Sequence, residues 1–296
     1  MPNLQELRRR VGSVRNMQKI TKAMKMVAAS RLRRAQQRVV AARPYSNTMA
    51  RVLARLAERA GEYKHPLLDP RGDNHYLLVL ITGDRGLCGA FNANLTKAAQ
   101  QFIREHPDKK IDLVTIGKKG RDFFRRRHAS ILREYTNVAD RGVSSETAAS
   151  IAHDVMEMYT AEESTIDAVF LIYSEFKTAL SQRAVVKQIL PIGTESFGAE
   201  PSSEPGQGEV LIDYLYEQPP AEIFGSLLPA YIDNQVFYAL LESTAGELGA
   251  KMTAMDSASN NAGEVIDALT LTINRVRQAS ITREIIEVVS GAQALD

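Results

Sequence analysis

The residues with the greatest potential for chemistry lie in a glycine-rich turn, Thr82–Asn92 (TGDRGLCGAFN). The turn follows a short apolar run and precedes a helix-like segment, where backbone amides and the helix dipole can hold an anion. However, Gly83, Gly86 and Gly89 are spaced G-x-x-G-x-x-G, which is neither the dinucleotide-binding pattern nor a P-loop. Close packing between a strand and a helix accounts for these glycines without a ligand, and we favour that interpretation.

The other candidates for a catalytic or metal site are weaker. The histidines have no metal-ligand spacing and lie in polar or terminal contexts: His65, His75, His106, His128 and His153. Cys88 is more typical of a small buried residue than of a nucleophile, and Gly117–Gly120 (GKKG) is more typical of a turn. No grouping of a nucleophile with a base is evident. We expect no catalytic residue, no cofactor and no metal, and keep a nucleotide-binding enzyme built on the middle region as an alternative.

The composition limits the possible classes of protein. The chain has 296 residues, 44% hydrophobic and 24% charged, which is enough for two domain-sized units. It contains no run of ~18 apolar residues that could span a membrane. The start, MPNLQELRRR, lacks the apolar core of a signal peptide. A lone cysteine cannot form an internal disulfide, which fits a reducing compartment.

The net charge of +2 conceals an asymmetry between the two ends of the chain. Residues 1–60 contain 15 Lys and Arg against two acids, a net charge of +13. Residues 221–296 contain four Arg and Lys against ten acids, a net charge of −6. The two ends are therefore electrostatically complementary, and the excess positive charge predicts an acidic partner outside the chain.

The last quarter of the sequence contains an unbroken heptad seam. Twelve positions alternate four and three apart, and ten of them are apolar or Ala: Leu241, Ala245, Leu248, Met252, Met255, Ser259, Ala262, Ile266, Leu269, Ile273, Val276 and Ser280. As one helix, residues 221–292 would be about 108 Å long at ~1.5 Å per residue. Pro229 and Asn260–Gly263 are weak points, but the constant phase favours a single helix.

A second seam occupies the N-terminal part. Its heptad frame begins at Leu4 and returns at Ala28 to continue to Ala60, crossing Pro44 in phase. We therefore expect one bent helix there. Between the two blocks, Met17, Ile20, Met24 and Val27 lie one residue out of frame. These residues predict a seam that rotates around the helix and then returns.

The two arms most simply pair with each other as an antiparallel coiled coil. Packing of each arm into an ordinary helical bundle is the alternative, but the chain has too little other helical sequence to cover such long seams. The basic arm could instead bind nucleic acid, yet residues 1–44 contain no aromatic side chain on which bases could stack. A protein partner is the better interpretation.

The middle of the chain alternates between strand-like and helix-like segments. The predicted strands are Tyr76–Thr82, Ile111–Ile116, Asp167–Tyr173 and Gln182–Ile192, and Val210–Tyr216 is a last strand or extended segment. The predicted helices are Asn92–His106, Arg121–Arg127 and Ser144–Glu163. This order favours an α/β fold, a Rossmann-like domain with a doubly wound parallel sheet. We expect an N-terminal helix at 1–61, the α/β domain at 62–218 and a C-terminal helix at 219–296.

Several stretches resemble one known family. Ile281–Ala294 (ITREIIEVVSGAQA) is similar to the C-terminal signature of the gamma subunit of F-type ATP synthases, and Ser13–Ser30 (SVRNMQKITKAMKMVAAS) to its N-terminal helix motif. Asp84–Asn92, Ala250–Asp256 and Arg275–Thr282 also match, in the family's order over nearly the whole chain. The lack of a transit peptide points to a bacterial member.

The resemblance implies the central rotor shaft of the synthase, which couples proton-driven rotation of the membrane c-ring to conformational cycling of the catalytic beta subunits. The implied partners are the alpha and beta subunits, the epsilon subunit and the c-ring, with one copy of the shaft per complex. It further implies a non-catalytic, peripheral subunit on the cytoplasmic face of the bacterial plasma membrane, without direct membrane insertion or nucleic-acid binding.

The resemblance also implies partner contacts, residue by residue. For the ring of alpha and beta subunits the matching positions are Met24, Lys25, Arg277, Gln278, Thr282, Glu284 and Glu287. For the foot near epsilon and the c-ring they are Tyr214, Tyr216 and Glu217. A single-helix end is expected for the C-terminal arm, because it outruns the N-terminal arm by about a dozen residues.

Overall fold

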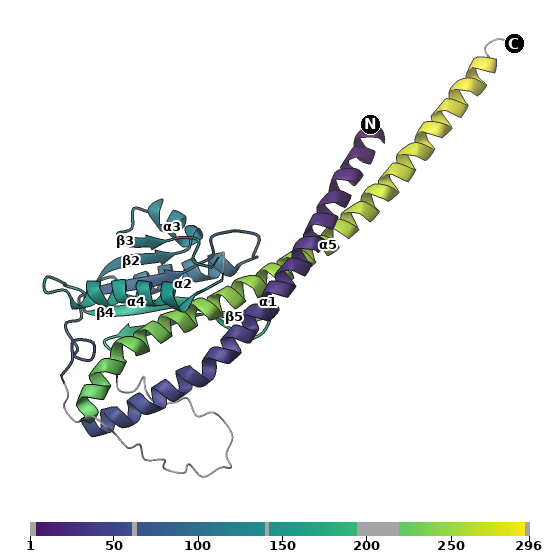
Figure 1. The fold of residues 1–296 in the computed structure, drawn as a ribbon. Coiled ribbons are helices and arrows are strands. Elements are labelled where there is room, and N and C mark those ends of the chain that lie inside the picture. Colours follow the sequence, from purple (N-terminus) through teal and green to yellow (C-terminus); the bar gives the residue numbers. More distant parts are fainter. Residues whose placement is uncertain (1–3, 61–63, 140–141, 194–218, 294–296) are drawn as a thin grey trace. The chain divides into compact units, whose positions relative to one another are not determined.

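The computed structural model describes residues 4–60, 64–139, 142–193 and 219–293 (Figure 1). The chain forms two compact units, Met1–Ser30 with Lys251–Asp296, and Arg31–Ala250. Both long helices contribute to each unit. We call residues 4–30 with 251–293 the exposed coil, and residues 31–60 with 220–250 the sheet-bound coil.

Two continuous helices dominate the secondary structure. Helix α1 spans Leu4–Ala60 and contains Pro44. Helix α5 spans Pro220–Gln293 and contains Pro229, and it passes through residues 260–263 without a break. Both predictions of a single helix are confirmed. Packing along an apolar face supplies most of a helix's stability. The unbroken apolar seam therefore outweighs the low helix propensity of single residues.

In the exposed coil the two helices run antiparallel, side by side (Figure 1). The Lys25 Nζ atom lies 2.6 Å from Asp256 Oδ1, and the Gln18 side chain donates to the Ser259 carbonyl oxygen at 3.3 Å. Residue numbers therefore fall along α1 as they rise along α5. The predicted seam of α5 is confirmed, since its positions are the least exposed of the segment: Met255, Ala262, Ile266, Leu269, Ile273 and Val276.

The predicted rotation of the α1 seam is wrong. The buried and half-buried positions continue in one frame through Val14, Gln18, Thr21, Lys25 and Ala28. Polar side chains occupy three of these positions and are satisfied by hydrogen bonds and an ion pair to α5 or to α1 itself.

Three of the four out-of-frame apolar residues face outward instead, and Met24 is half-buried. Met17, Ile20 and Val27 are 61%, 60% and 53% exposed. Polar residues occupy the seam positions here instead of apolar ones, as they do at some positions of other coiled coils. We call Gln18, Thr21 and Lys25 the polar layer.

The sheet-bound coil has a more deeply buried seam. Leu53 and Leu56 of α1 and Leu228 and Ile232 of α5 have no exposed surface. The Asn234 side chain donates a 2.8 Å hydrogen bond to the Ser46 hydroxyl, which links the two helices across the seam.

A five-stranded sheet forms the rest of this unit, in the order β3-β2-β1-β4-β5. Its strands are β1 (His75–Ile81), β2 (Lys110–Ile116), β3 (Ile131–Tyr135), β4 (Ala168–Phe176) and β5 (Gln182–Leu190). The first four in this order pair parallel, and β5 pairs antiparallel to β4. The helices between the strands are α2 (Phe91–Glu105), α3 (Lys118–Arg125) and α4 (Ser145–Thr160).

The helices cover both faces of the sheet. Helices α2 and α3 pack through Leu95, Phe102 and Phe124 on the face that carries Leu78 and Leu80 of β1. The connection from β3 through α4 to β4 returns across the sheet in the opposite direction. Because such crossovers are right-handed, α4 lies on the other face. The doubly wound α/β fold predicted from the sequence is confirmed.

Two local predictions need correction. Strand β3 was not predicted, because ILREY has no apolar run: it is an edge strand with charged, partly exposed side chains. Gly117–Gly120 is not simply a turn, since α3 begins at Lys118. Gly117 has a φ of 99°, and a Cβ there would lie 2.1 Å from the Thr82 carbonyl oxygen. The predicted segment Val210–Tyr216 lies outside the described residues.

Candidate functional site

The glycine-rich turn after β1 is held by its own side chains. The Gly83 amide donates to the Asn92 side-chain oxygen at 2.9 Å. The two Asp84 carboxylate oxygens accept from the amides of Lys118 at 3.1 Å and Asn137 at 2.9 Å. Three backbone amides at this end of the sheet, those of Gly83, Lys118 and Asn137, are thus paired within the fold.

Helix α5 fills the space beyond the carboxyl ends of β1 and β2, where doubly wound sheets bind ligands. Leu240, Ser243 and Glu247 of α5 line this space together with Thr82 and Gly83. The cavity that remains has a volume of about 20 Å³. That is room for about one water molecule, whereas a small-molecule pocket needs roughly 300 Å³ or more. The packing interpretation holds for Gly83, where a Cβ would lie 2.9 Å from Glu247 Oε2, but not for Gly86, where the nearest atom is 3.9 Å away. The small cavity does not support a nucleotide site at this edge.

The histidine at the start of β1 has the predicted polar partners, but its burial was not predicted. His75 is 6% exposed, and its two ring nitrogens lie 2.8 Å from Asp112 Oδ2 and 2.8 Å from Thr165 Oγ1. The contact between His75 and Asp112 joins the beginnings of β1 and β2. Among the described residues, no group of three His, Cys, Asp or Glu side chains could hold a metal ion. None of the helices in the described ranges has the length and apolar character needed to span a membrane.

The single-helix end of α5 (residues 277–288) is the most exposed part of the exposed coil. Burial along the seam stops at Val276, and every side chain from 277 to 288 is exposed. This confirms the predicted single-helix end. Ile281, Ile285 and Val288 are 49%, 58% and 71% exposed. Exposed apolar side chains grouped on one helix are a feature of protein interaction surfaces.

The predicted contact residues of this segment are all accessible. Arg277, Gln278, Thr282, Glu284 and Glu287 are exposed. The Ser280 hydroxyl lies 3.3 Å from a Glu284 carboxylate oxygen.

The predicted contact residues of α1 lie at the level of the polar layer. Met24 is half-buried, and Lys25 is engaged with Asp256 rather than free in solution. Exposed side chains at this level include the apolar Met17 and Ile20 and the basic Lys19 and Lys22.

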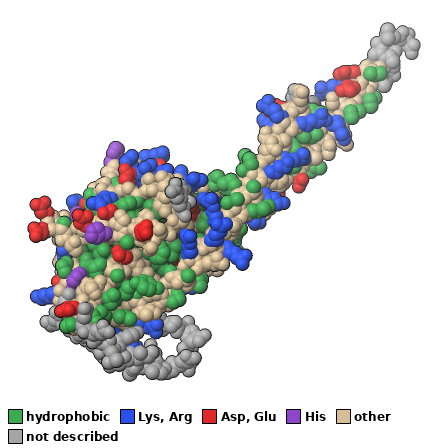
Figure 2. Space-filling model, in the orientation of Figure 1, with side chains coloured by type: hydrophobic (Ala, Val, Ile, Leu, Met, Phe, Trp, Pro, Cys, Tyr) green, Lys and Arg blue, Asp and Glu red, His purple; other side chains and the backbone are tan. Residues whose placement is uncertain are grey.

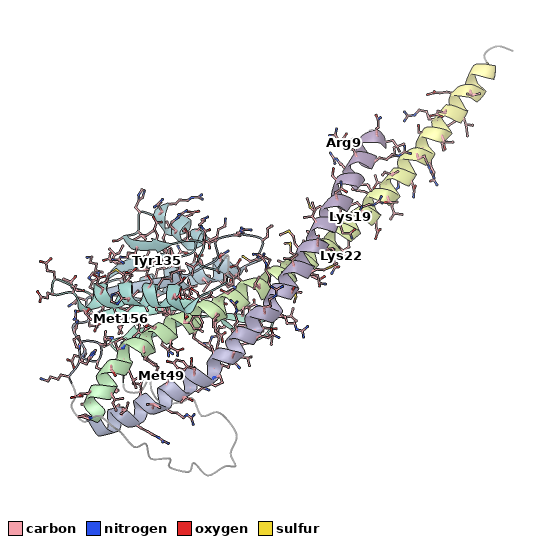
Figure 3. All side chains as sticks on the ribbon, viewed as in Figure 1. Arg9, Lys19, Lys22, Met49, Tyr135 and Met156 are labelled. Atoms are coloured by element: carbon pink, nitrogen blue, oxygen red, sulfur yellow. The ribbon has the colours of Figure 1, made fainter. Side chains whose placement is uncertain are left out.

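Figure 3 labels Arg9, Lys19 and Lys22 along this helix, and Lys and Arg side chains gather on the exposed coil in Figure 2. The sequence prediction did not separate the paired Lys25 from its accessible neighbours.

The third predicted group, Tyr214, Tyr216 and Glu217, lies outside the described residues.

Sequence reasoning missed a polar junction between α5 and the sheet. Glu242 and Ser243 are 2% and 3% exposed, and both accept hydrogen bonds from backbone amides of β4. The available signal was the small residues Ser243, Gly246 and Gly249, spaced three apart on one helix face, which permit close approach to another element. These residues were overlooked because the heptad pattern predicts only the contacts of α5 with α1, and they do not lie on that seam.

Comparison with known proteins agrees with the resemblance. A family model described as ATP synthase matches residues 3–295. The ATP synthase gamma chain of Solibacter usitatus is 49% identical over 302 residues, with full coverage of both chains. That of Pelotomaculum thermopropionicum is 46% identical over 296 residues, again with full coverage. The chain belongs to the ATP synthase gamma chain family.

Solved structures agree with this assignment. A central stalk and c-ring structure of the Tetrahymena thermophila mitochondrial ATP synthase matches with a TM-score of 0.62 and 26% identity, over 81% of this chain and 99% of that one. A Euglena gracilis mitochondrial ATP synthase structure matches with a TM-score of 0.67 over 99% and 94% of the two chains, and at 18% identity it supports the fold alone. The gamma chain is a non-catalytic stalk subunit, and the rotor-shaft role predicted from the sequence is supported.

Proposed function

We propose that the chain turns inside a bacterial ATP synthase as its central shaft and that the exposed coil contacts the alpha and beta subunits. The observation that carries this proposal is the single-helix end of α5, which is exposed on all sides and displays apolar residues. An isolated helical segment of about a dozen residues is marginal in water. It gains stability when a surrounding protein covers it.

On α5 the contacts with the alpha and beta subunits are made by Arg277, Gln278, Thr282, Glu284 and Glu287. Their exposure supports this proposal. The segment offers both charge signs and apolar groups, so that a ring of subunits can meet a different face at each rotor angle.

On α1 the contacts are made around Met24 and Lys25. Lys19 and Lys22 supply the accessible positive charge at this level, and Met17 and Ile20 the accessible apolar surface. An acidic track on the beta subunits fits this combination. Lys25 then acts by fixing the register of the coil through Asp256, as polar seam residues do in coiled coils.

The remaining partners are the epsilon subunit and the c-ring, contacted through Tyr214, Tyr216 and Glu217. One copy serves each complex. It is held peripherally at the cytoplasmic face of the plasma membrane through its partners, without inserting into the bilayer and without binding nucleic acid.

Coupling in this scheme is a population shift. The two-helix coil presents an asymmetric surface to a ring of repeated subunits, so each beta subunit makes different contacts with it at a given angle. Those differential contacts favour one conformation of each subunit over the others, and rotation changes which subunit is favoured.

The test is reconstitution of the purified chain with bacterial alpha and beta subunits. We expect a complex with one copy of the chain whose ATP hydrolysis exceeds that of the alpha and beta subunits alone. A chain that does not bind the ring, while another gamma chain does so under the same conditions, would contradict the proposal. ATP turnover by the isolated chain would favour an enzyme instead.

A further inference from the structure

Strand β4 extends beyond its neighbour in the sheet. It pairs with β1 from Ala168 to Ile172 and continues to Phe176. Alternate residues of a strand direct their N–H groups to the same side. The amides of Ser174 and Phe176 therefore point to the side where β1 has ended. Such buried amides need another acceptor.

Helix α5 supplies both acceptors with adjacent residues. The Ser174 amide donates to the Ser243 hydroxyl oxygen at 2.9 Å, and the Phe176 amide donates to Glu242 Oε2 at 2.6 Å. The helix lies directly on the strand here, since a Cβ at Gly246 would lie 2.8 Å from the Ser174 hydroxyl oxygen. Two side chains of α5 thus replace the missing strand.

The same carboxylate also reaches α1. Glu242 Oε1 lies 4.0 Å from an Arg43 guanidinium nitrogen. The Tyr238 side chain hydrogen-bonds with both Arg43 and Glu242. Burial, together with the hydrogen bond to the Glu242 carboxylate, raises the pKa of Tyr238, so the phenol stays a neutral donor. One buried carboxylate therefore contacts the sheet and both long helices.

We propose that Glu242, together with Ser243 and Arg43, is the joint that fixes the sheet to the two long helices and carries torque between them. This inference rests on the proposed rotor function. The hydrophobic effect that drives apolar packing is non-directional. Hydrogen bonds to a charged group are short, strong and directional, so they resist rotation of α5 on the edge of the sheet.

The first experiment measures amide hydrogen exchange in the free full-length chain. The test variant is Glu242→Leu with Ser243→Ala, which removes both acceptors at similar volume. Ser226→Ala is the matched control, because the Ser226 hydroxyl donates only to the Ile223 carbonyl oxygen of its own helix. We expect exchange at Ser174 and Phe176 to accelerate roughly five-fold or more in the double variant. Unchanged exchange at both amides would overturn the inference.

The second experiment measures the angular fluctuations of a stalled rotor in the assembled complex. The double variant should widen these fluctuations and lower proton pumping per ATP hydrolysed, and Glu242→Gln, which keeps one oxygen acceptor, should have a smaller effect. Val155→Ala in α4 is the control for general destabilisation, because it creates a buried cavity away from the joint. It should lower the melting temperature without widening the fluctuations.

The outcomes separate the joint from the rotor function. If the unaltered chain rotates and the double variant fluctuates no more than it does, the joint is wrong and the rotor function stands. If the unaltered chain does not rotate in the complex, the rotor function itself fails.

Discussion

The sheet-bound coil and the exposed coil belong to the same two helices but bury their seams to different degrees. In the sheet-bound coil, Leu53, Leu56, Leu228 and Ile232 are fully buried. In the exposed coil, Leu269 and Ile273 are only half-buried and residues 277–288 not at all. One heptad pattern therefore serves two purposes. Where the sheet also covers the helices, the apolar seam is part of a protein core. Elsewhere the helices keep exposed surface that partners can contact.

The largest effect is expected from a cavity in the sheet-bound coil. Leu53→Ala should lower the free energy of unfolding of the sheet-containing unit by about 3 kcal/mol, because a fully buried leucine is lost from a packed seam. Urea denaturation followed by circular dichroism measures this. Leu180→Ala is the control, since that side chain is 80% exposed. Equal losses for the two variants would contradict the comparison.

Acid should also act on the sheet-containing unit, through Asp167. Burial raises the pKa of this carboxyl, but the amides of Asn74, His75 and Gly72 donate to it and together lower the pKa below its ordinary value. The stabilisation is complete above the unfolded pKa of about 4 and is lost as the pH falls through the folded value.

Asp167→Asn should therefore reduce stability at pH 7 by roughly 2 kcal/mol, from weakened hydrogen bonds to a charged group. It should also flatten the loss of stability below about pH 4. Urea unfolding from pH 7 down to pH 3 tests both. A variant with the same pH dependence as the original chain would rule out this role for Asp167.

A cavity in the exposed coil should cost less. Ile273→Ala removes a half-buried side chain, so we expect a loss of about 1 kcal/mol. Amide exchange of residues 4–30 and 251–276 reports this locally. A loss as large as that of Leu53→Ala would show that both coils are packed alike.

The smallest effect is expected from the ion pair in the polar layer. Lys25 and Asp256 are 41% and 46% exposed, so a double-mutant cycle with Ala should give a coupling energy below about 1 kcal/mol. The same pair should matter more for helix register, which cross-linking of single cysteines placed in α1 and α5 can measure. A coupling energy of several kcal/mol would contradict the exposure of this layer.

Much of the fold was predictable because its signals are local and periodic. The seam of α5 and the strand runs of β1, β2 and β4 follow from apolar spacing alone. Strand β3 could not be predicted, since an edge strand with Arg133 and Glu134 carries no apolar run. The true frame of the α1 seam was also hidden, because its positions there hold polar residues: Thr21 is buried and Gln18 and Lys25 are half-buried, with polar partners on α5 or on α1 itself.

The candidate contacts were predictable only in part. Exposure of the positions from Arg277 to Glu287 follows from the unequal lengths of the two arms. The joint around Glu242 depends on where β1 ends relative to β4, a long-range register that no local pattern contains.

The most direct test of the central claim concerns the single-helix end of α5. Ile281→Ser with Ile285→Ser changes residues that are 49% and 58% exposed, so the stability of the free chain should stay within about 0.5 kcal/mol of the original. Leu180→Ser is the matched control. In the reconstituted complex the double variant should lower ring binding and coupled ATP hydrolysis, and the control should not. Full binding and hydrolysis by the double variant would contradict the claim that this helix end is a partner surface.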